Sequence, residues 1–403
     1  MTPPAPKAPV EDSRWERVLL LAGIVVLAFN LRPAAVSVGP VLDEITSALG
    51  MSGAVAGVLT TLPVLAFAAF GALAPELARR LGLHHVTLVS LVAVVVGLGI
   101  RARTDEIWVF LVASLVGLGG MATANVLLPS LVKLHFPRRV GLLTSVYTTS
   151  MAVGLTFASS LTVPIAEQTG SWRWGLFAWA LTAVVAALPW IGLLRHDRTP
   201  SPEPHTITLR QVARTRLGWS MALFFGLQSL QAYSIFGWFA QVYRDAGFSA
   251  TTAGLLLGVI TAMSIPLSFL IPSFAARMHH QTWLIVGLIA CYPVGYLGLI
   301  LAPVAGAWAW AVLVGTAASV FPLVLTLIGL RARTREGTAA LSGFTQSVGY
   351  LIAAVGPFGM GVLYDATGGW TVPLSVLLVL VVGQLAAGLA VARPSYIEDS
   401  VRR

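Results

Sequence analysis

An arginine stands in the middle of the first long apolar run of the chain, within the sequence Asn30-Leu31-Arg32-Pro33. If this run of roughly 27 residues crosses a bilayer as a helix, about 20 Å of helix separates Arg32 from either end. A charge at that depth costs about 2.5–3.5 kcal/mol, so Arg32 is expected to face a cavity or a partner. Its planar guanidinium offers N–H donors that suit a carboxylate or another small oxyanion.

Two prolines follow the arginine and predict an irregular helix. Pro33 has no N–H, which leaves the Phe29 carbonyl without its usual helical donor, and Pro40 does the same to Val36. Exposed backbone is tolerated at membrane depth where it lines a cavity, which favours a binding role for this segment. The alternative is structural, with Arg32 held by helix-end carbonyls or by Asn125.

The carboxylates of the chain stand near the ends of the apolar runs, away from Arg32. Asp43 and Glu44 are close to the end of the first run, and Glu76 follows the second. Proton-driven carriers often use a buried Asp or Glu as the relay. We therefore expect an incoming anion to neutralise Arg32, and we assign any proton coupling to Asp43 or Glu44.

Further polar residues stand in the middle of apolar runs and are candidates for the wall of a substrate cavity. Spacings of three and four residues place Gln228 with Gln231, and Gln346 with Tyr350, on shared helix faces. Hydrogen bonding between helices is the alternative for each of them. With Arg32, the candidate substrate-binding residues are Asn30, Asn125, Tyr147, Gln228, Gln231, Gln346 and Tyr350.

The sequence lacks the motifs of several common enzyme and nucleotide-binding sites. There is no GxxxxGK[ST] for a nucleotide phosphate, no HExxH for zinc and no GxSxG nucleophile elbow. The single cysteine, Cys291, has no second thiol with which to form a disulfide or a metal site. We expect no catalytic residue, cofactor or metal, which leaves a membrane enzyme or a sensor as distant alternatives to a transporter.

The elements that position these residues follow from composition. Of the 403 residues 57% are hydrophobic and 10% are charged, whereas a soluble domain carries about 25% charged residues. The apolar runs have the length of membrane-spanning helices, so the sequence predicts an all-α membrane protein of twelve spans. They are expected near 17–43, 53–74, 86–102, 107–132, 140–164, 173–194, 217–243, 251–275, 283–303, 307–330, 338–364 and 371–392.

Basic residues are unequally divided between the loops on the two sides. With both termini on one side, that side holds twenty of the 25 Lys and Arg residues, and the other holds only Arg101, Arg103, Arg173 and Arg244. The positive-inside rule makes the basic side cytoplasmic. The net charge of +9 is thus explained by topology, and no nucleic acid is expected as a partner.

The two halves of the chain repeat in sequence. Residues 50–59 (GMSGAVAGVL) align with residues 247–256 (GFSATTAGLL), and TGSW at 169–172 aligns with TGGW at 367–370. Two six-span halves in one orientation are the parallel repeat of a transporter, with the substrate site between them. The expected parts are a disordered cytoplasmic tail (1–16), the first bundle (17–194), a cytoplasmic linker (195–216), the second bundle (217–392) and a cytoplasmic tail (393–403).

Several segments together resemble one family of the major facilitator superfamily, the cyanate-permease and nitroimidazole-transporter family. They are the NLRP segment with SVGPVLDEI after it, AGVLTTLPVLAF (56–67), NVLLPSLVK (125–133), FPRRVGLLTSVYTT (136–149) and SWRW (171–174). The loop after the second span, GALAPELARRLG (71–82), resembles the gating loop of the superfamily in Arg79 and Arg80. It has Pro75 where an acid is usual, and Glu76 next to it is the substitute.

The resemblance implies twelve helices around a central cavity, working by alternating access in a bacterial plasma membrane. It implies a small anion or a small polar heterocycle as substrate, moved by a chain that suffices as a monomer. Arg32 as a lone cationic anchor agrees with an anionic or oxygen-rich ligand. The alternative within transport is efflux of a hydrophobic drug, for which Arg32 would be dispensable.

Overall fold

The computed structural model describes residues 14–136, 139–194 and 207–401, and these residues form helices joined by short connections. The helices of the first half are α1 (Arg14–Asn30), α2 (Pro33–Val36), η1 (Gly39–Val41), α3 (Leu42–Leu49), α4 (Gly53–Leu81), α5 (Leu83–Arg101), α6 (Ile107–His135), α7 (Val140–Thr169) and α8 (Trp172–Leu193). Those of the second half are α9 (Leu209–Val212), α10 (Arg216–Asp245), α11 (Ala250–Ala262), α12 (Ser264–Arg277), α13 (Thr282–Ile289), α14 (Cys291–Leu301), α15 (Ala307–Ala318), α16 (Val320–Leu330), α17 (Arg335–Thr367), α18 (Thr371–Ala392) and α19 (Ile397–Val401).

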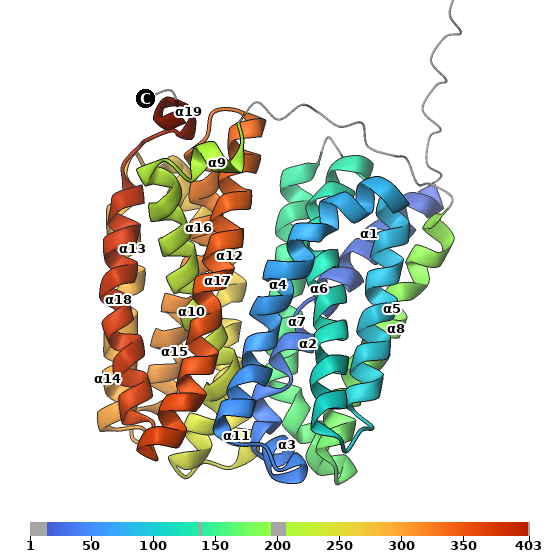
Figure 1. Cartoon of the computed structure of the whole chain (residues 1–403), viewed down its shortest axis with the longest axis vertical. Coiled ribbons are helices and arrows are strands. Elements are labelled where there is room, and N and C mark those ends of the chain that lie inside the picture. Colours follow the sequence, from blue (N-terminus) through green and yellow to red (C-terminus); the bar gives the residue numbers. More distant parts are fainter. Residues whose placement is uncertain (1–13, 137–138, 195–206, 402–403) are drawn as a thin grey trace, which may run out of the picture.

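The two halves stand side by side as two helical bundles (Figure 1). We call the end that carries α9 and α19 the linker end, and the opposite end the α3 end. The predicted tail 1–16 and linker 195–216 lie largely outside the described residues, although α9 falls within the second of these ranges. The predicted fold class, an all-α membrane protein of two six-helix bundles, is confirmed.

Eleven helical segments among the described residues have the length and apolar composition of a membrane span. The twelfth long helix of the prediction is α10, which has 30 residues. It is more polar than the other eleven segments, and it packs against α11, α17 and α18. Most of its side chains are buried, among them Gln228 and Gln231. A helix surrounded by protein tolerates polar side chains that a lipid-facing helix does not.

The sequence repeat corresponds to a structural repeat at the α3 end. Ser52 caps the first turn of α4 by accepting from the Val55 N–H, and Ser249 caps α11 by accepting from the Thr252 N–H. The glycines two residues before these caps have φ of 65° and 102°, values that favour glycine over residues with a side chain. The two halves therefore begin their second spans with the same backbone turn.

The first span is broken as the prolines predict. Helix α1 ends at Asn30, α2 begins at Pro33, and Leu31 and Arg32 connect them outside regular helix. The break meets α7, where a Cβ on Gly154 would lie 2.0 Å from the Phe29 carbonyl oxygen. The carbonyl that loses its helical donor is thus closely covered by α7, because Gly154 has no side chain.

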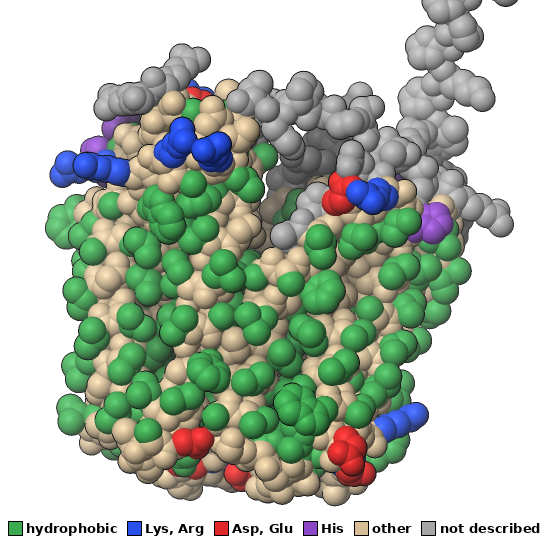
Figure 2. Space-filling model, in the orientation of Figure 1, with side chains coloured by type: hydrophobic (Ala, Val, Ile, Leu, Met, Phe, Trp, Pro, Cys, Tyr) green, Lys and Arg blue, Asp and Glu red, His purple; other side chains and the backbone are tan. Residues whose placement is uncertain are grey.

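The halves meet closely toward the α3 end and separate at the linker end. A Cβ on Gly39 would lie 2.1 Å from the carbonyl oxygen of Phe236 in α10, and one on Gly57 would lie 3.0 Å from that of Phe358 in α17. Figure 2 shows a hollow between the halves at the linker end, with apolar side chains along the flanks of both. This arrangement is open at the linker end and closed at the α3 end.

Candidate substrate site

Arg32 lies at the break of the first span and is half-buried. Its own carbonyl oxygen accepts from the N–H groups of Ala35 and Val36, at 3.0 and 3.1 Å, so its backbone begins helix α2. Because Arg32 stands between the end of α1 and the start of α2, its side chain belongs to the surface of neither helix. The break thus holds a cation between the packed helices of the first half and α10.

Three aromatic residues surround the Arg32 guanidinium. Its Cζ lies 5.9 Å from the centre of the Phe67 ring of α4. Phe67 stacks on Tyr350 of α17, with ring centres 5.0 Å apart and planes 17° apart. The hydroxyl of Tyr233, from α10, faces the guanidinium, and Tyr350 is within electrostatic range of both. We call Arg32, Phe67, Tyr233 and Tyr350 the Arg32 cluster; it joins the two halves.

No carboxylate forms an ion pair with Arg32 among the described residues. The ion pairs there involve Arg80, Arg173, Arg244 and Arg333, all near helix ends. No hydrogen bond in that part of the chain joins Arg32 to Asn125 or to a helix-end carbonyl. The arrangement therefore keeps a cationic fork with aromatic walls, which suits a small anion or an electron-rich planar ring.

Asn30 is buried and engaged in packing the first half. Its amide nitrogen donates to the Val26 carbonyl at 2.9 Å, and its amide oxygen accepts from the Thr182 hydroxyl of α8 at 2.8 Å. These bonds stabilise the end of α1 against α8. Asn30 supports the break beside Arg32, and its predicted contact with substrate has no geometric support.

The glutamines of α10 point into the second half. Gln228 donates to the Ala318 carbonyl at 2.8 Å and accepts from Gln384 at 2.6 Å. Gln231 donates to the Leu377 carbonyl at 2.9 Å and accepts from the Tyr296 hydroxyl at 2.7 Å. Both side chains are fully buried. Both glutamines therefore form hydrogen bonds between helices, which was the alternative to a role in the cavity wall. The structure does not bring them together with Arg32.

Tyr233 and Phe67 belong to the Arg32 cluster and were not predicted. At 100° per residue, Tyr233 lies about 200° around α10 from Gln231, on the opposite face. That face meets the first half, since a Cβ on Gly237, one turn further on, would lie 2.8 Å from Thr60 of α4. The spacing of Tyr233 and Gly237, one helical turn apart, is the sequence signal that could have shown which face of α10 meets the first half.

Asn125 of α6, Tyr147 of α7 and Gln346 of α17 are each half-buried. Gln346 donates to the hydroxyl of Ser342, one turn away on α17, at 2.7 Å. No hydrogen bond or ring contact within the described chain joins any of the three to Arg32. Tyr350, predicted with Gln346, is the member of this group that the structure places beside the arginine.

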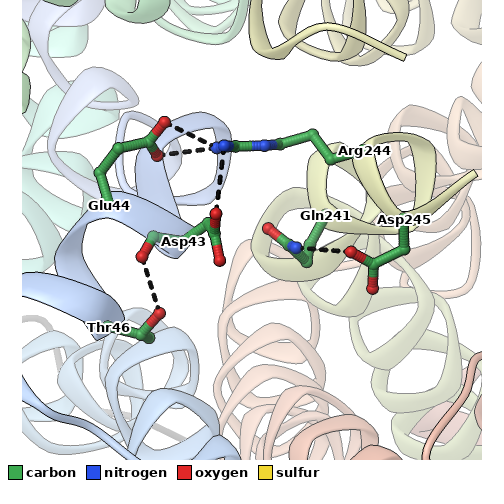
Figure 3. A network of polar contacts seen from close by, with 6 residues as sticks. All are labelled: Asp43, Glu44, Thr46, Gln241, Arg244 and Asp245. Carbon is green, nitrogen blue, oxygen red and sulfur yellow. Dashed lines mark hydrogen bonds and ion pairs between the residues drawn. The ribbon is translucent and has the colours of Figure 1, made fainter. Parts of the chain in front are cut away.

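An ion-pair network joins the halves at the α3 end (Figure 3). Arg244, near the end of α10, donates to both carboxylate oxygens of Glu44 at 2.8 Å and to Asp43 at 3.1 Å. Both carboxylates lie in the first turn of α3. Asp43 and Glu44, predicted as coupling residues, are thus the partners of a cation on the other half, and Arg244 is no isolated loop charge.

Other polar contacts cross between the halves near the same end. Asp365 of α17 accepts from the N–H of Ala54 in the first turn of α4 at 2.9 Å. Glu167 of α7 accepts from the hydroxyl of Thr251 in α11 at 2.7 Å. At the linker end, the predicted gating residue Glu76 pairs with Arg80 one turn away on α4, and the side chain of Arg79 lies outside the described residues. The polar closure among the described residues is therefore strongest at the α3 end.

A membrane protein of two six-helix bundles, with a hollow and a charged site between them, has the architecture of a transporter. The sequence profile of the Major Facilitator Superfamily matches residues 18–357. The chain belongs to this superfamily, whose members are transporters and not enzymes.

Relatives of similar length carry more specific names. The chain is 38% identical over 387 residues to the "Uncharacterized transporter YycB" of Bacillus subtilis (95% of this chain, 96% of the relative). It is 35% identical to the 2-nitroimidazole transporter of Escherichia coli (94% and 96%) and 28% identical to its cyanate transport protein CynX (93% and 97%). A bacterial homologue of the human lysosomal transporter Spinster has the same fold, with a TM-score of 0.77, 14% identity and coverage of 96% and 99%.

Proposed function

We propose that this chain transports a small anion, or a small polar heterocycle with an oxygen-rich substituent, and that Arg32 anchors the ligand. The observation that carries this proposal is the Arg32 cluster: a lone cation with aromatic neighbours from both halves. Relatives named for cyanate and 2-nitroimidazole agree with ligands of this size and polarity.

The cluster supplies two kinds of contact to such a ligand. The guanidinium forms charge-assisted hydrogen bonds, worth about 1.5–3 kcal/mol each when both partners are sequestered from water. The rings of Phe67 and Tyr350 stack on each other and are almost fully buried in this conformation, so a planar ligand stacks on them by replacing that contact. Because these groups come from α4 and α17, on different halves, a bound ligand touches both halves and responds to their relative movement.

Alternating access assigns roles to the two ends of the molecule. In this conformation the ligand enters from the linker end, through the hollow between the halves (Figure 2). Opening of the α3 end separates Arg244 from Asp43 and Glu44. Protonation of either carboxylate removes the charge that Arg244 binds, and this is how we propose that a proton gradient couples to transport, if the carrier is proton-driven.

The orientation in the membrane follows from the distribution of charge. We propose that the linker end, the termini and the 195–216 linker face the cytoplasm of a bacterial cell, with the chain in its plasma membrane, because the positive-inside rule favours this orientation. A single chain contains both halves and the whole Arg32 cluster, so we propose a monomer as the transporting unit.

Ligand-induced stabilisation of the purified, detergent-solubilised protein tests the proposal. Small oxyanions, carboxylates and neutral heterocycles are compared in wild type and in Arg32→Lys, since a ligand that binds only the folded state raises the Tm. An oxyanion should stabilise wild type and should require at least roughly tenfold more ligand in Arg32→Lys, because lysine lacks the bidentate fork. Equal stabilisation of both proteins by neutral hydrophobic compounds, with no effect of anions, would favour drug efflux instead.

A further inference from the structure

A second arginine, Arg101, is completely buried at the end of α5. One terminal nitrogen of its guanidinium donates to the Ala34 carbonyl of α2 at 3.1 Å, and the other donates to the Ser37 hydroxyl at 3.1 Å. The sequence predicts Arg101 in a loop; this prediction is wrong, because Arg101 is the last residue of α5 and its side chain turns inward to α2. It holds the short helix α2, which begins directly after Arg32.

The positive charge of Arg101 has no anionic partner in the described chain. None of the ion pairs there includes it, and its two acceptors are neutral. Burial of a cation costs several kcal/mol unless a counter-charge and hydrogen bonds offset the loss of water. An anion beside Arg101 would supply that counter-charge.

A small, partly enclosed cavity lies beside Arg101, with a volume of about 10 Å³. Arg101 and Ser114 of α6 both line it, and Tyr233, Phe236 and Gly237 of α10 form its wall on the second half. The Nε of Arg101 and the hydroxyl of Ser114 are buried without a hydrogen-bond partner among the described residues. The cavity therefore lies between two residues that each carry an unpaired hydrogen-bond donor.

We propose that this cavity binds a small monovalent anion of halide size, held by Arg101 Nε and the Ser114 hydroxyl. The uncompensated positive charge and the two unpaired groups favour an anion, and a space of about 10 Å³, the lower limit for one water, excludes sulfate and phosphate and admits a halide only if its walls yield slightly. A bridging water is the competing occupant, since a cavity of this size also holds one water molecule.

The location of the site gives it a role in the conformational cycle. One wall belongs to α10 of the second half, and the opposite wall belongs to the first half. The cavity is complete only while the halves are packed together toward the α3 end. The bound anion therefore stabilises the conformation that is closed at that end, independently of any ligand at Arg32.

A halide titration at constant ionic strength tests the site. Purified wild type in gluconate buffer is titrated with chloride or bromide, and the Tm is recorded. The Tm should rise to a plateau, and Ser114→Ala should require roughly tenfold more halide for half of this rise, since it loses one charge-assisted hydrogen bond. Bromide-soaked crystals should show one anomalous peak within hydrogen-bond distance of Arg101 Nε.

Two variants serve as matched controls. Ser229→Ala removes another buried serine hydroxyl that has no partner among the described residues, on α10 and outside the cavity; its halide response should equal that of wild type. Arg32→Lys should also keep the response, which separates this site from the proposed substrate site. A Tm independent of halide identifies a water as the occupant and overturns the proposal, as does an unchanged half-saturation in Ser114→Ala.

Discussion

Replacement of Arg244 by glutamine should shift the protein toward a conformation that is open at the α3 end. Arg244 is 19% exposed, and its partners Asp43 and Glu44 are 48% and 34% exposed, so solvent screens the pairs in part. Exposed ion pairs contribute about 0.2–1 kcal/mol each. One terminal nitrogen of Arg244 contacts both Glu44 oxygens at 2.8 Å and the other contacts Asp43 at 3.1 Å, so each pair falls within this range.

The two pairs together thus favour closure by about 0.4–2 kcal/mol, a factor of roughly 2–30 in the ratio of closed to open molecules. Spin labels at Ser47 and Ala366, exposed positions on the two halves, report the separation across the α3 end in a Cys291→Ser background. Double electron–electron resonance should show a growing population at longer distance in Arg244→Gln. Added salt should have the same direction of effect in wild type.

The matched control is Arg173→Gln. Arg173 pairs with Asp105 near the same end of the molecule, but both residues belong to the first half. Loss of that pair leaves the contact between the halves intact, so the distance distribution should not change. The reasoning would be refuted by an unchanged distribution in Arg244→Gln, or by equal shifts in both variants.

Three further substitutions test the packing and the ligand site. Gln228→Leu should lower stability by about 1–3 kcal/mol, because the Gln384 amide loses its acceptor; Gln228→Leu combined with Gln384→Leu should recover part of the Tm. Gly39→Ala places a Cβ 2.1 Å from the Phe236 carbonyl oxygen and should lengthen the spin-label distance at the α3 end, whereas no change would show that α10 can yield. Tyr350→Leu should weaken the binding of planar ligands several-fold, as measured by titrating the Tm with ligand. Tyr350→Phe should bind them as wild type does, because the ring of Tyr350, and not its hydroxyl, stacks on Phe67.

The membrane-spanning helices could be predicted because the bilayer imposes length and composition on each of them. The equivalence of helices in the two halves could also be predicted. The glycine and serine at each repeat boundary have local conformational requirements, so the alignment of 50–59 with 247–256 marks equivalent turns. The break at Arg32 was predictable for the same reason, since Pro33 cannot donate to the preceding turn.

The face of α10 could not be predicted in this way. A helix surrounded by protein has no apolar, lipid-facing side. The position of its polar residues therefore does not show which of its faces lines a cavity. Gln228 and Gln231 bind within the second half, and Tyr233 on the opposite face reaches Arg32. The inward turn of Arg101 depends on α2, whose carbonyl and hydroxyl groups become its acceptors only through tertiary packing.

Uptake into proteoliposomes tests the role of Arg32 most directly. Counterflow of the radiolabelled anion that best stabilises wild type is measured for wild type and Arg32→Lys, with the Tm of each protein confirming that both are folded. The account predicts that Arg32→Lys needs at least roughly tenfold more substrate for half-maximal uptake, because the bidentate contact is lost. Equal concentration dependence in the two proteins would contradict it and would make Arg32 a structural residue.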